Sequence, residues 1–340
     1  MVRTALMFPG LGAFFPAAFR YHSTARRIAV ETAAQIDPVV CEYGLAPVGP
    51  SLLDGEPLDT APGSPVADTE STDAETTDTG IADTMVLAVY AAEITCYRVL
   101  REEGRIAGDV LIGHSLGEYA ALVAAGAFSV ADGARLLCER SASLRRCRIP
   151  PGAMLAVSVS RRYAERWARQ AEDVVVAAVN GPEQVVLSGR EDEILALQAR
   201  LTSEGHAATL LRTGRLPHHH PLLTKAYLDY TWRVQSVAQE PLRRAVHSPL
   251  LRRRYRACDD LRQALALQMI LPVDFLGAVT ELRGDGIEDF IECGLRCALT
   301  NLLSVAAPDA RAAAPFRMRT TPHDLRNALD ALRPALQEDP

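Results

Sequence analysis

The segment Gly113-His-Ser-Leu-Gly117 constrains the fold of this chain more than any other feature. An apolar run at Val110–Ile112 precedes it, and an alanine-rich run follows it as far as Gly126. A serine with a glycine two residues away on each side, between a strand and a helix, is typical of a nucleophile elbow, in which the strained serine projects its hydroxyl from the sheet edge. Amide groups at the start of the following helix can then stabilise an oxyanion. The alternative is a capped turn without chemistry.

Composition narrows the class of protein. The chain has 340 residues, of which 48% are hydrophobic and 23% charged, and a net charge of −6, as in a soluble globular protein with a large core. The charge and the lack of a basic, aromatic-containing run argue against a nucleic-acid partner. No apolar segment is long enough for a membrane span, and prolines and glycines interrupt the uncharged stretch 4–19 that resembles a signal peptide. The seven cysteines are scattered without a CxxC pair, which indicates reduced thiols and a cytoplasmic protein. We expect a monomer.

The first part of the chain alternates strand and helix patterns. The patterns predict strands over 4–8 and 110–112 and helices over 84–101 and 116–125, the βαβ arrangement of an α/β domain with a parallel sheet. Residues 55–80 are acidic and poor in large apolar side chains, so we expect a flexible surface loop there. A lid or an acidic partner contact is the alternative interpretation of this loop.

The pattern changes after Pro151-Gly152. Strands over 154–159, 174–179, 184–187 and 208–211, with helices over 161–170 and 191–203, give the order βαββαβ of a ferredoxin-like unit. We therefore predict a small ferredoxin-like subdomain at 152–213, inserted into an α/β-hydrolase-like subdomain formed by 1–150 and 215–340.

A serine nucleophile needs a base, and the run His218-His219-His220 is the obvious place to look for one. Three adjacent histidines could also bind a metal, but no acidic or cysteine co-ligands lie at helical spacing, so we expect no metal. His114, beside the serine, is expected to pack or to position rather than to act as the base.

Several segments now resemble one known family. They are Phe8-Pro-Gly-Leu-Gly12, Gly113-His-Ser-Leu-Gly-Glu118, Arg140, the hairpin 180–189, His219-His-Pro-Leu-Leu223, and Gln268 followed by Pro272–Phe275. In this order, from about Leu6 to Leu303, they resemble the malonyl-CoA:acyl-carrier-protein transacylases and the acyltransferase domains of polyketide synthases.

The resemblance implies a Ser115–His219 dyad with ping-pong kinetics. The backbone N–H groups of Leu11 and Leu116 would hold the oxyanion, and the segment containing Gln268 would orient the histidine through a backbone carbonyl. Acyl-CoA would be the donor and the phosphopantetheine thiol of an acyl carrier protein the acceptor, with no bound cofactor.

The resemblance also implies that Arg140 binds the free carboxylate of a malonyl-type group, a task that guanidinium geometry suits. A surface role is the alternative.

Family glutamines are replaced by Leu11 and, approximately, by Val86, and His218 precedes the catalytic histidine. These departures suggest a larger or more lipophilic acyl group, or a changed acceptor. We expect the acyl pocket to include the following residues: His114, Val86, His218 and Asn180.

An acidic carrier protein would dock on basic side chains. The candidates are Arg252, Arg253 and Arg254, together with Arg145 and Arg146, although a merely solvated patch is the alternative.

The preferred function is a stand-alone acyltransferase of polyketide or related, antibiotic-type biosynthesis. Two alternatives share Ser115 and His219: a hydrolase that clears wrongly loaded carrier proteins, and a transferase of an unusual acyl group between carrier proteins. A generic esterase would need an acid between serine and histidine, and nothing there stands out. A non-catalytic protein does not account for the survival of nucleophile, base and carboxylate ligand together.

Overall fold

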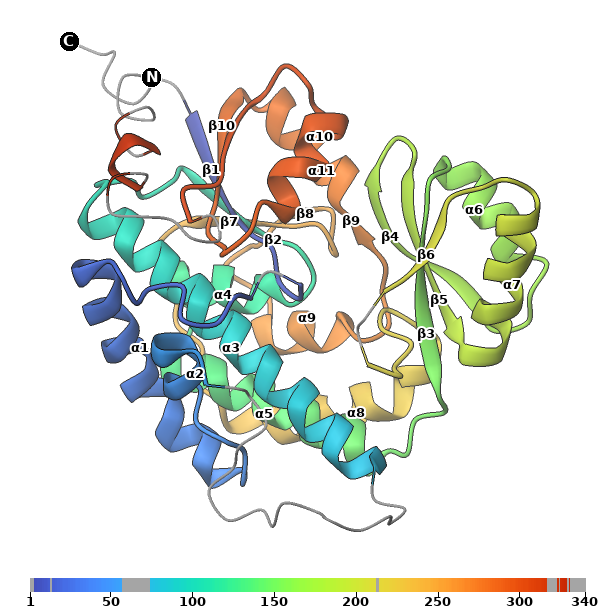
Figure 1. Cartoon of the computed structure of the whole chain (residues 1–340), viewed down its shortest axis with the longest axis horizontal. Helices are drawn as coiled ribbons and strands as arrows, with labels where there is room; N and C mark the ends of the chain where they lie inside the picture. Colours follow the sequence, from blue (N-terminus) through green and yellow to red (C-terminus); the bar gives the residue numbers. More distant parts are fainter. Residues whose placement is uncertain are drawn as a thin grey trace.

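The computed structural model describes residues 3–12, 14–56, 74–211, 214–316, 323, 325–328 and 330. Two β-sheets organise the chain, a larger one at its centre and a smaller one to one side, with helices on their faces (Figure 1).

The larger sheet has six strands in the order β11-β10-β1-β2-β7-β8, all parallel except for the antiparallel pair β7–β8. Phe8, the last residue of β1, lies opposite Gly113, the last residue of β2. The loops that follow these two strands therefore leave the sheet at the same edge. The strands are β1 (Arg3–Phe8), β2 (Val110–Gly113), β7 (Ala245–Ser248), β8 (Arg253–Arg254), β10 (Ile287–Glu292) and β11 (Arg311–Ala313).

The smaller sheet has the order β6-β3-β5-β4-β9. Its first four strands pair antiparallel in the arrangement of a ferredoxin-like unit, and β9 adds a parallel edge to β4. The strands are β3 (Gly152–Val157), β4 (Val174–Gly181), β5 (Gln184–Arg190), β6 (Ala208–Leu210) and β9 (Val273–Asp274).

The helices divide between these sheets. Figure 1 shows α1, α3 and α5 on one side of the large sheet, α10 and α11 on the other, and α6 and α7 beside the small sheet. The α-helices are α1 (Ser23–Glu42), α2 (Gly49–Asp54), α3 (Ala74–Glu102), α4 (Gly117–Ala124), α5 (Val130–Arg146), α6 (Arg161–Ala168), α7 (Glu191–Ser203), α8 (Thr224–Arg233), α9 (Leu261–Leu267), α10 (Phe275–Gly284) and α11 (Ala298–Ala306). Two 3-10 helices are η1 (Pro221–Leu223) and η2 (Val234–Ser236).

The alternation of side chains along β1 explains the layers. Leu6 and Phe8 belong to the apolar cluster under α1, α3 and α5, whereas Ala5 and Met7 belong to the cluster under α10 and α11. Successive side chains of a strand point to opposite faces, so a strand covered on both faces is apolar throughout. The second cluster also includes Met154 of β3, which joins the small sheet to the large one.

The structure agrees with the predicted α/β class and with the βαββαβ order, and it corrects one boundary. Helix α3 begins at Ala74, inside the range 55–80 that we predicted as a loop. The rest of that loop prediction, 57–73, lies outside the described residues. The division into 152–213 and the flanking segments stays a prediction, to which β9 adds a strand from outside the inserted range.

Helix α1, which contains Pro38, was not predicted from the sequence. Among the described residues, no helix combines the length and apolar character that crossing a bilayer requires.

Candidate active site

Ser115 stands in the turn between β2 and α4 with a positive φ of 51°. A Cβ on Gly113 would lie 2.3 Å from the backbone of Glu118, and one on Gly117 would lie 2.0 Å from the carbonyl oxygen of Phe8. Only glycine fits at these two positions, because the turn packs directly against the end of β1. The structure therefore has the strained geometry of a nucleophile elbow.

The loop at residues 9–12, which we call the oxyanion turn, meets the elbow at the edge of the large sheet. Gly10 has a φ of 72°, and a Cβ there would lie 2.7 Å from the carbonyl oxygen of His114. Among the described residues, the N–H groups of Leu11 and Leu116 donate to no backbone acceptor. Two unpaired donors beside a serine hydroxyl are what an oxyanion site requires.

His219 is the candidate base. Its Nε2 lies 2.7 Å from Ser115 Oγ, and its Nδ1 lies 2.9 Å from the carbonyl oxygen of Leu271. Because a carbonyl can only accept, Nδ1 carries the proton and Nε2 is left to accept the serine proton. Burial lowers the pKa of His219 to about 3, against the Leu271 carbonyl, which raises it, so the imidazole is neutral at physiological pH.

The orienting contact lies in the predicted segment, mainly at a different residue. We expected the segment containing Gln268 to orient the histidine, and within it Nδ1 donates a hydrogen bond to the carbonyl of Leu271, three residues after Gln268. The Gln268 carbonyl acts on the imidazole more weakly. A backbone acceptor has no residue-type signature, so the sequence alone could not distinguish these positions.

Glu118 connects the elbow helix to that segment, a role that sequence reasoning missed. It is 1% exposed, and its two carboxylate oxygens accept hydrogen bonds from Tyr255 (2.7 Å) and from the Gln268 side chain (2.9 Å). Burial raises the pKa of Glu118, and these hydrogen bonds oppose the rise. The only signal in the sequence was its place one residue after the motif glycine.

Arg140 projects from α5 and is 7% exposed. One terminal nitrogen lies 3.2 Å from Nδ1 of His218, and its Nε has no hydrogen-bond partner. Among the described residues, no carboxylate pairs with it. Its charge also lowers the pKa of His219, after the larger effect of burial, so the guanidinium stands close to the dyad.

The three consecutive histidines point to different partners. His218 faces Arg140 and His219 faces Ser115, whereas His220 contacts the Asp173 carbonyl and accepts the Leu222 N–H. Within the described part of the chain, no three potential ligands gather around a common point that could hold a metal.

The other acyl-pocket candidates lie in different surroundings. His114 Nε2 lies 2.8 Å from the side-chain oxygen of Asn180, which joins the elbow to β4 of the small sheet. Val86 is buried in the cluster beneath α3. The pocket role of all four candidates, His114, Val86, Asn180 and His218, stays a prediction.

The arginines predicted for carrier-protein docking all form ion pairs within the chain. Arg252 pairs with Asp274, Arg253 with Asp259 and Arg254 with Asp285. Arg145 likewise pairs with Asp83, and Arg146 with Asp229. Their docking role stays a prediction, with less free positive charge behind it than the sequence indicates.

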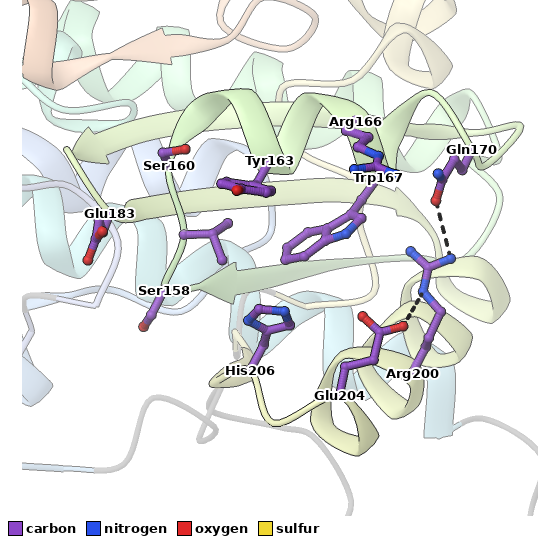
Figure 2. A pocket seen from close by; sticks show the side chains of 11 residues that line it. Ser158, Ser160, Tyr163, Arg166, Trp167, Gln170, Glu183, Arg200, Glu204 and His206 are labelled. Atoms are coloured by element: carbon purple, nitrogen blue, oxygen red, sulfur yellow. Dashed lines mark hydrogen bonds and ion pairs between the residues drawn. The ribbon is translucent and has the colours of Figure 1, made fainter.

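A surface pocket of about 450 Å³ lies beside α6 and α7, apart from the dyad (Figure 2). Trp167 meets His206 edge-on there, with ring centroids 5.2 Å apart, and Arg200 contacts Glu204. Neither Ser115 nor His219 lines this pocket, so it is not part of the catalytic site.

A serine–histidine pair at the edge of an α/β sheet is typical of enzymes that form an acyl ester on the serine. The chain belongs to the acyl transferase domain family, whose model matches residues 66–306. This confirms the family inferred from the sequence motifs.

Among curated proteins, the chain is 31% identical over 224 residues to the polyketide biosynthesis protein ThaF of Burkholderia thailandensis, covering 65% of this chain and 19% of that protein. It is 29% identical over 225 residues to the malonyl CoA-acyl carrier protein transacylase of Escherichia coli, covering 63% of this chain and 71% of the other. The chain thus spans less than a fifth of ThaF.

Among solved structures, the malonyl-CoA:acyl carrier protein transacylase of Xanthomonas oryzae has a TM-score of 0.78 at 26% identity, covering 97% of this chain and 99% of that one. A malonyl-transacylase in complex with a type II PKS acyl-carrier protein has a TM-score of 0.80 at 22% identity, covering 97% and 99%. The fold is therefore that of the transacylases, a large α/β part with a small inserted part.

Proposed function

We propose that this enzyme transfers a malonyl-type acyl group from coenzyme A to the phosphopantetheine thiol of an acyl carrier protein, through an acyl ester on Ser115, in polyketide biosynthesis. The observation that carries the proposal is the buried Arg140 guanidinium, which has no carboxylate partner among the described residues and stands next to the Ser115–His219 pair. A buried charge needs a partner, and the carboxylate of a malonyl group supplies one.

In the first half-reaction, His219 Nε2 takes the hydroxyl proton as Ser115 Oγ attacks the thioester carbonyl. The carbonyl oxygen becomes an oxyanion held by the N–H groups of Leu11 and Leu116, each of which lowers the barrier by ~2–4 kcal/mol. The intermediate collapses by breaking the carbon–sulfur bond. The His219 proton goes to the departing thiolate, leaving coenzyme A and acyl-Ser115.

The second half-reaction runs the same steps with a different thiol. The phosphopantetheine thiol gives its proton to His219 and attacks the ester carbonyl. The oxyanion forms again in the same site, the carbon–oxygen bond breaks, and His219 returns the proton to Ser115. The Nδ1 contact to Leu271 keeps the ring in the required tautomer throughout.

Arg140 would select the acyl group. Its Nε and terminal nitrogens can bind a carboxylate through two parallel hydrogen bonds. An acetyl group would leave the guanidinium buried and unpaired, so it would bind more weakly.

The solved transacylase bound to an acyl-carrier protein supports the choice of acceptor. The hydrolase alternative is not favoured, because the named relatives are transacylases and polyketide synthases. We also propose that the enzyme is cytoplasmic and monomeric.

The test is to incubate the purified protein with malonyl-, methylmalonyl- and acetyl-CoA and to measure its intact mass, with Ser115→Ala as the control. We expect a covalent adduct from a carboxylated donor, little from acetyl-CoA, none in the variant, and discharge of the adduct by a holo acyl carrier protein. Release of free coenzyme A without an adduct would indicate hydrolysis, and no turnover at all would contradict the coenzyme A donor.

A further inference from the structure

A second buried carboxyl group contacts the oxyanion turn from beneath. Glu93, on α3, is 1% exposed, and its Oε1 accepts a hydrogen bond of 2.5 Å from the N–H of Gly10. Its other oxygen, Oε2, has no hydrogen-bond partner among the described residues. A buried carboxyl oxygen without a partner is costly, so the position of Glu93 requires an explanation beyond packing.

The Gly10 peptide decides where the next amide points. Gly10 is held on one side by the elbow, since a Cβ there would lie 2.7 Å from the His114 carbonyl oxygen and 2.9 Å from the Gly117 nitrogen. On the other side it is held by the Glu93 carboxyl group. Because Gly10 is restrained on both sides, the following N–H, that of Leu11, has little freedom to turn away from Ser115.

The surroundings of Glu93 favour its neutral form. The pKa of Glu93 is raised to about 8, mainly by burial; the Gly10 hydrogen bond lowers it, and the charge of Glu292 of β10 contributes to the rise. The other titratable groups that interact with it are Tyr90 and Cys96 of α3 and Cys293, which directly follows β10. Burial raises the pKa of each of these three, so they stay uncharged where Glu93 titrates.

We propose that Glu93 is a positioning residue of the acyl transfer: its neutral carboxyl group fixes the Gly10 peptide so that the Leu11 N–H meets the oxyanion. The neutral state matters because an ionised Glu93 would place a negative charge beside the developing oxyanion. The stronger hydrogen bond of the anion to Gly10 does not compensate, since it is present equally before and during the reaction. Ionisation therefore slows transfer.

This inference rests on the proposed function, and its test uses two substitutions. Glu93→Met removes the acceptor of the Gly10 N–H without adding a buried charge, and Glu93→Gln keeps an acceptor but cannot ionise. Asp109→Leu is the matched control, because Asp109 accepts the Thr4 N–H at the opposite end of the same strand β1.

We expect Glu93→Met to lower kcat for malonyl transfer by about 10- to 100-fold with the donor KM changed less than about threefold, and Asp109→Leu to leave kcat unchanged. The wild-type kcat should fall above about pH 8, and Glu93→Gln should keep kcat at pH 7 and lose that fall. An unchanged kcat in Glu93→Met, or an alkaline fall that persists in Glu93→Gln, would overturn the inference.

A second readout does not need turnover. Hydrogen exchange of the peptide covering residues 8–12 should become at least about tenfold faster in Glu93→Met and stay as in the wild type in Asp109→Leu. Unchanged exchange in Glu93→Met would contradict the positioning role. If the wild-type protein accepts no acyl group from any thioester, the proposed function is refuted. If exchange is nevertheless faster in Glu93→Met than in the wild type, the Glu93–Gly10 contact is still supported.

Discussion

The two sides of Ser115 differ in how completely their polar groups are paired. On the base side, the imidazole of His219 has a partner at both nitrogens, and both carboxylate oxygens of Glu118 accept hydrogen bonds. On the substrate side, the Leu11 and Leu116 N–H groups donate to no backbone acceptor, and the Arg140 Nε has no partner, among the described residues.

Buried polar groups are normally paired, so those beside Ser115 that lack a partner in the free protein are candidates for binding the substrate. We therefore expect the paired side to maintain the geometry and the unpaired side to bind the acyl group. Substitutions on the two sides should therefore behave in opposite ways.

The largest effect is expected from the base. His219→Ala leaves Ser115 without a proton acceptor, and acylation should slow by about 10²- to 10⁴-fold. The measurement is the rate of adduct formation by intact mass. His220→Ala is the matched control, because His220 bonds to Leu222 and Asp173 and not to Ser115. Equal losses in the two variants would show that the region, and not the base, was disturbed.

The next effect separates activity from stability. Arg140→Leu should lower kcat/KM for malonyl-CoA by about 100-fold, because the carboxylate loses its ligand. It should also stabilise the free protein by ~1 kcal/mol or more, because an unpaired buried charge disappears. Activity and the denaturant midpoint are measured together.

Arg135→Leu, on the same helix, is the control for this pair of measurements, because Arg135 is only half-buried and is paired with Glu42. A loss of stability in Arg140→Leu would mean that the guanidinium is already paired with an anionic group in the free protein.

A paired group should give the reverse pattern. Glu118→Leu leaves the Tyr255 hydroxyl and the Gln268 amide buried without acceptors, so the free energy of unfolding should fall by about 2–4 kcal/mol. Because Gln268 precedes Leu271, acylation should also slow, by about tenfold. Chemical denaturation tests this, with the exposed Glu288→Leu as control. A stable Glu118→Leu protein would contradict the assignment.

The smallest effect concerns pH. The pKa of His219 is lowered to about 3, so its base form is present throughout the neutral range. The acylation rate should change less than about twofold between pH 5 and pH 7, instead of halving near the ordinary histidine value. The unfolded chain binds the His219 proton more tightly, so this group lowers stability as pH falls from 6.5 towards 3. A rate that follows an apparent pKa near 6.5 would contradict the buried, neutral imidazole.

Sequence patterns predicted what depends on residue type and local spacing. The elbow glycines specify the turn at Ser115, the βαββαβ order was visible from β-branched runs and an amphipathic α7, and the position of His219 came from motif order. The Leu271 carbonyl was missed because every residue has a carbonyl. The contact of Glu93 with Gly10 joins positions 83 residues apart, and no local pattern carries it.

Long-range contacts also explain why the basic runs were predicted to carry more free charge than they do. Arg254 pairs with Asp285, 31 residues away, so a basic run in the sequence is electrostatically paired in the fold. The two-residue strands β8 and β9 are too short to show a period of two.

Strand β9 has a consequence for engineering. It begins two residues after Leu271 and pairs with the edge of β4. Asn180 of β4 also contacts His114, the residue before Ser115. The small sheet thus braces the base and the nucleophile at once. Because β9 lies outside residues 152–213, a chimaera that exchanges that range for the corresponding range of a relative must keep a β4 edge that pairs with β9 and an asparagine that contacts His114. Without them, the hybrid should fold but should not turn over.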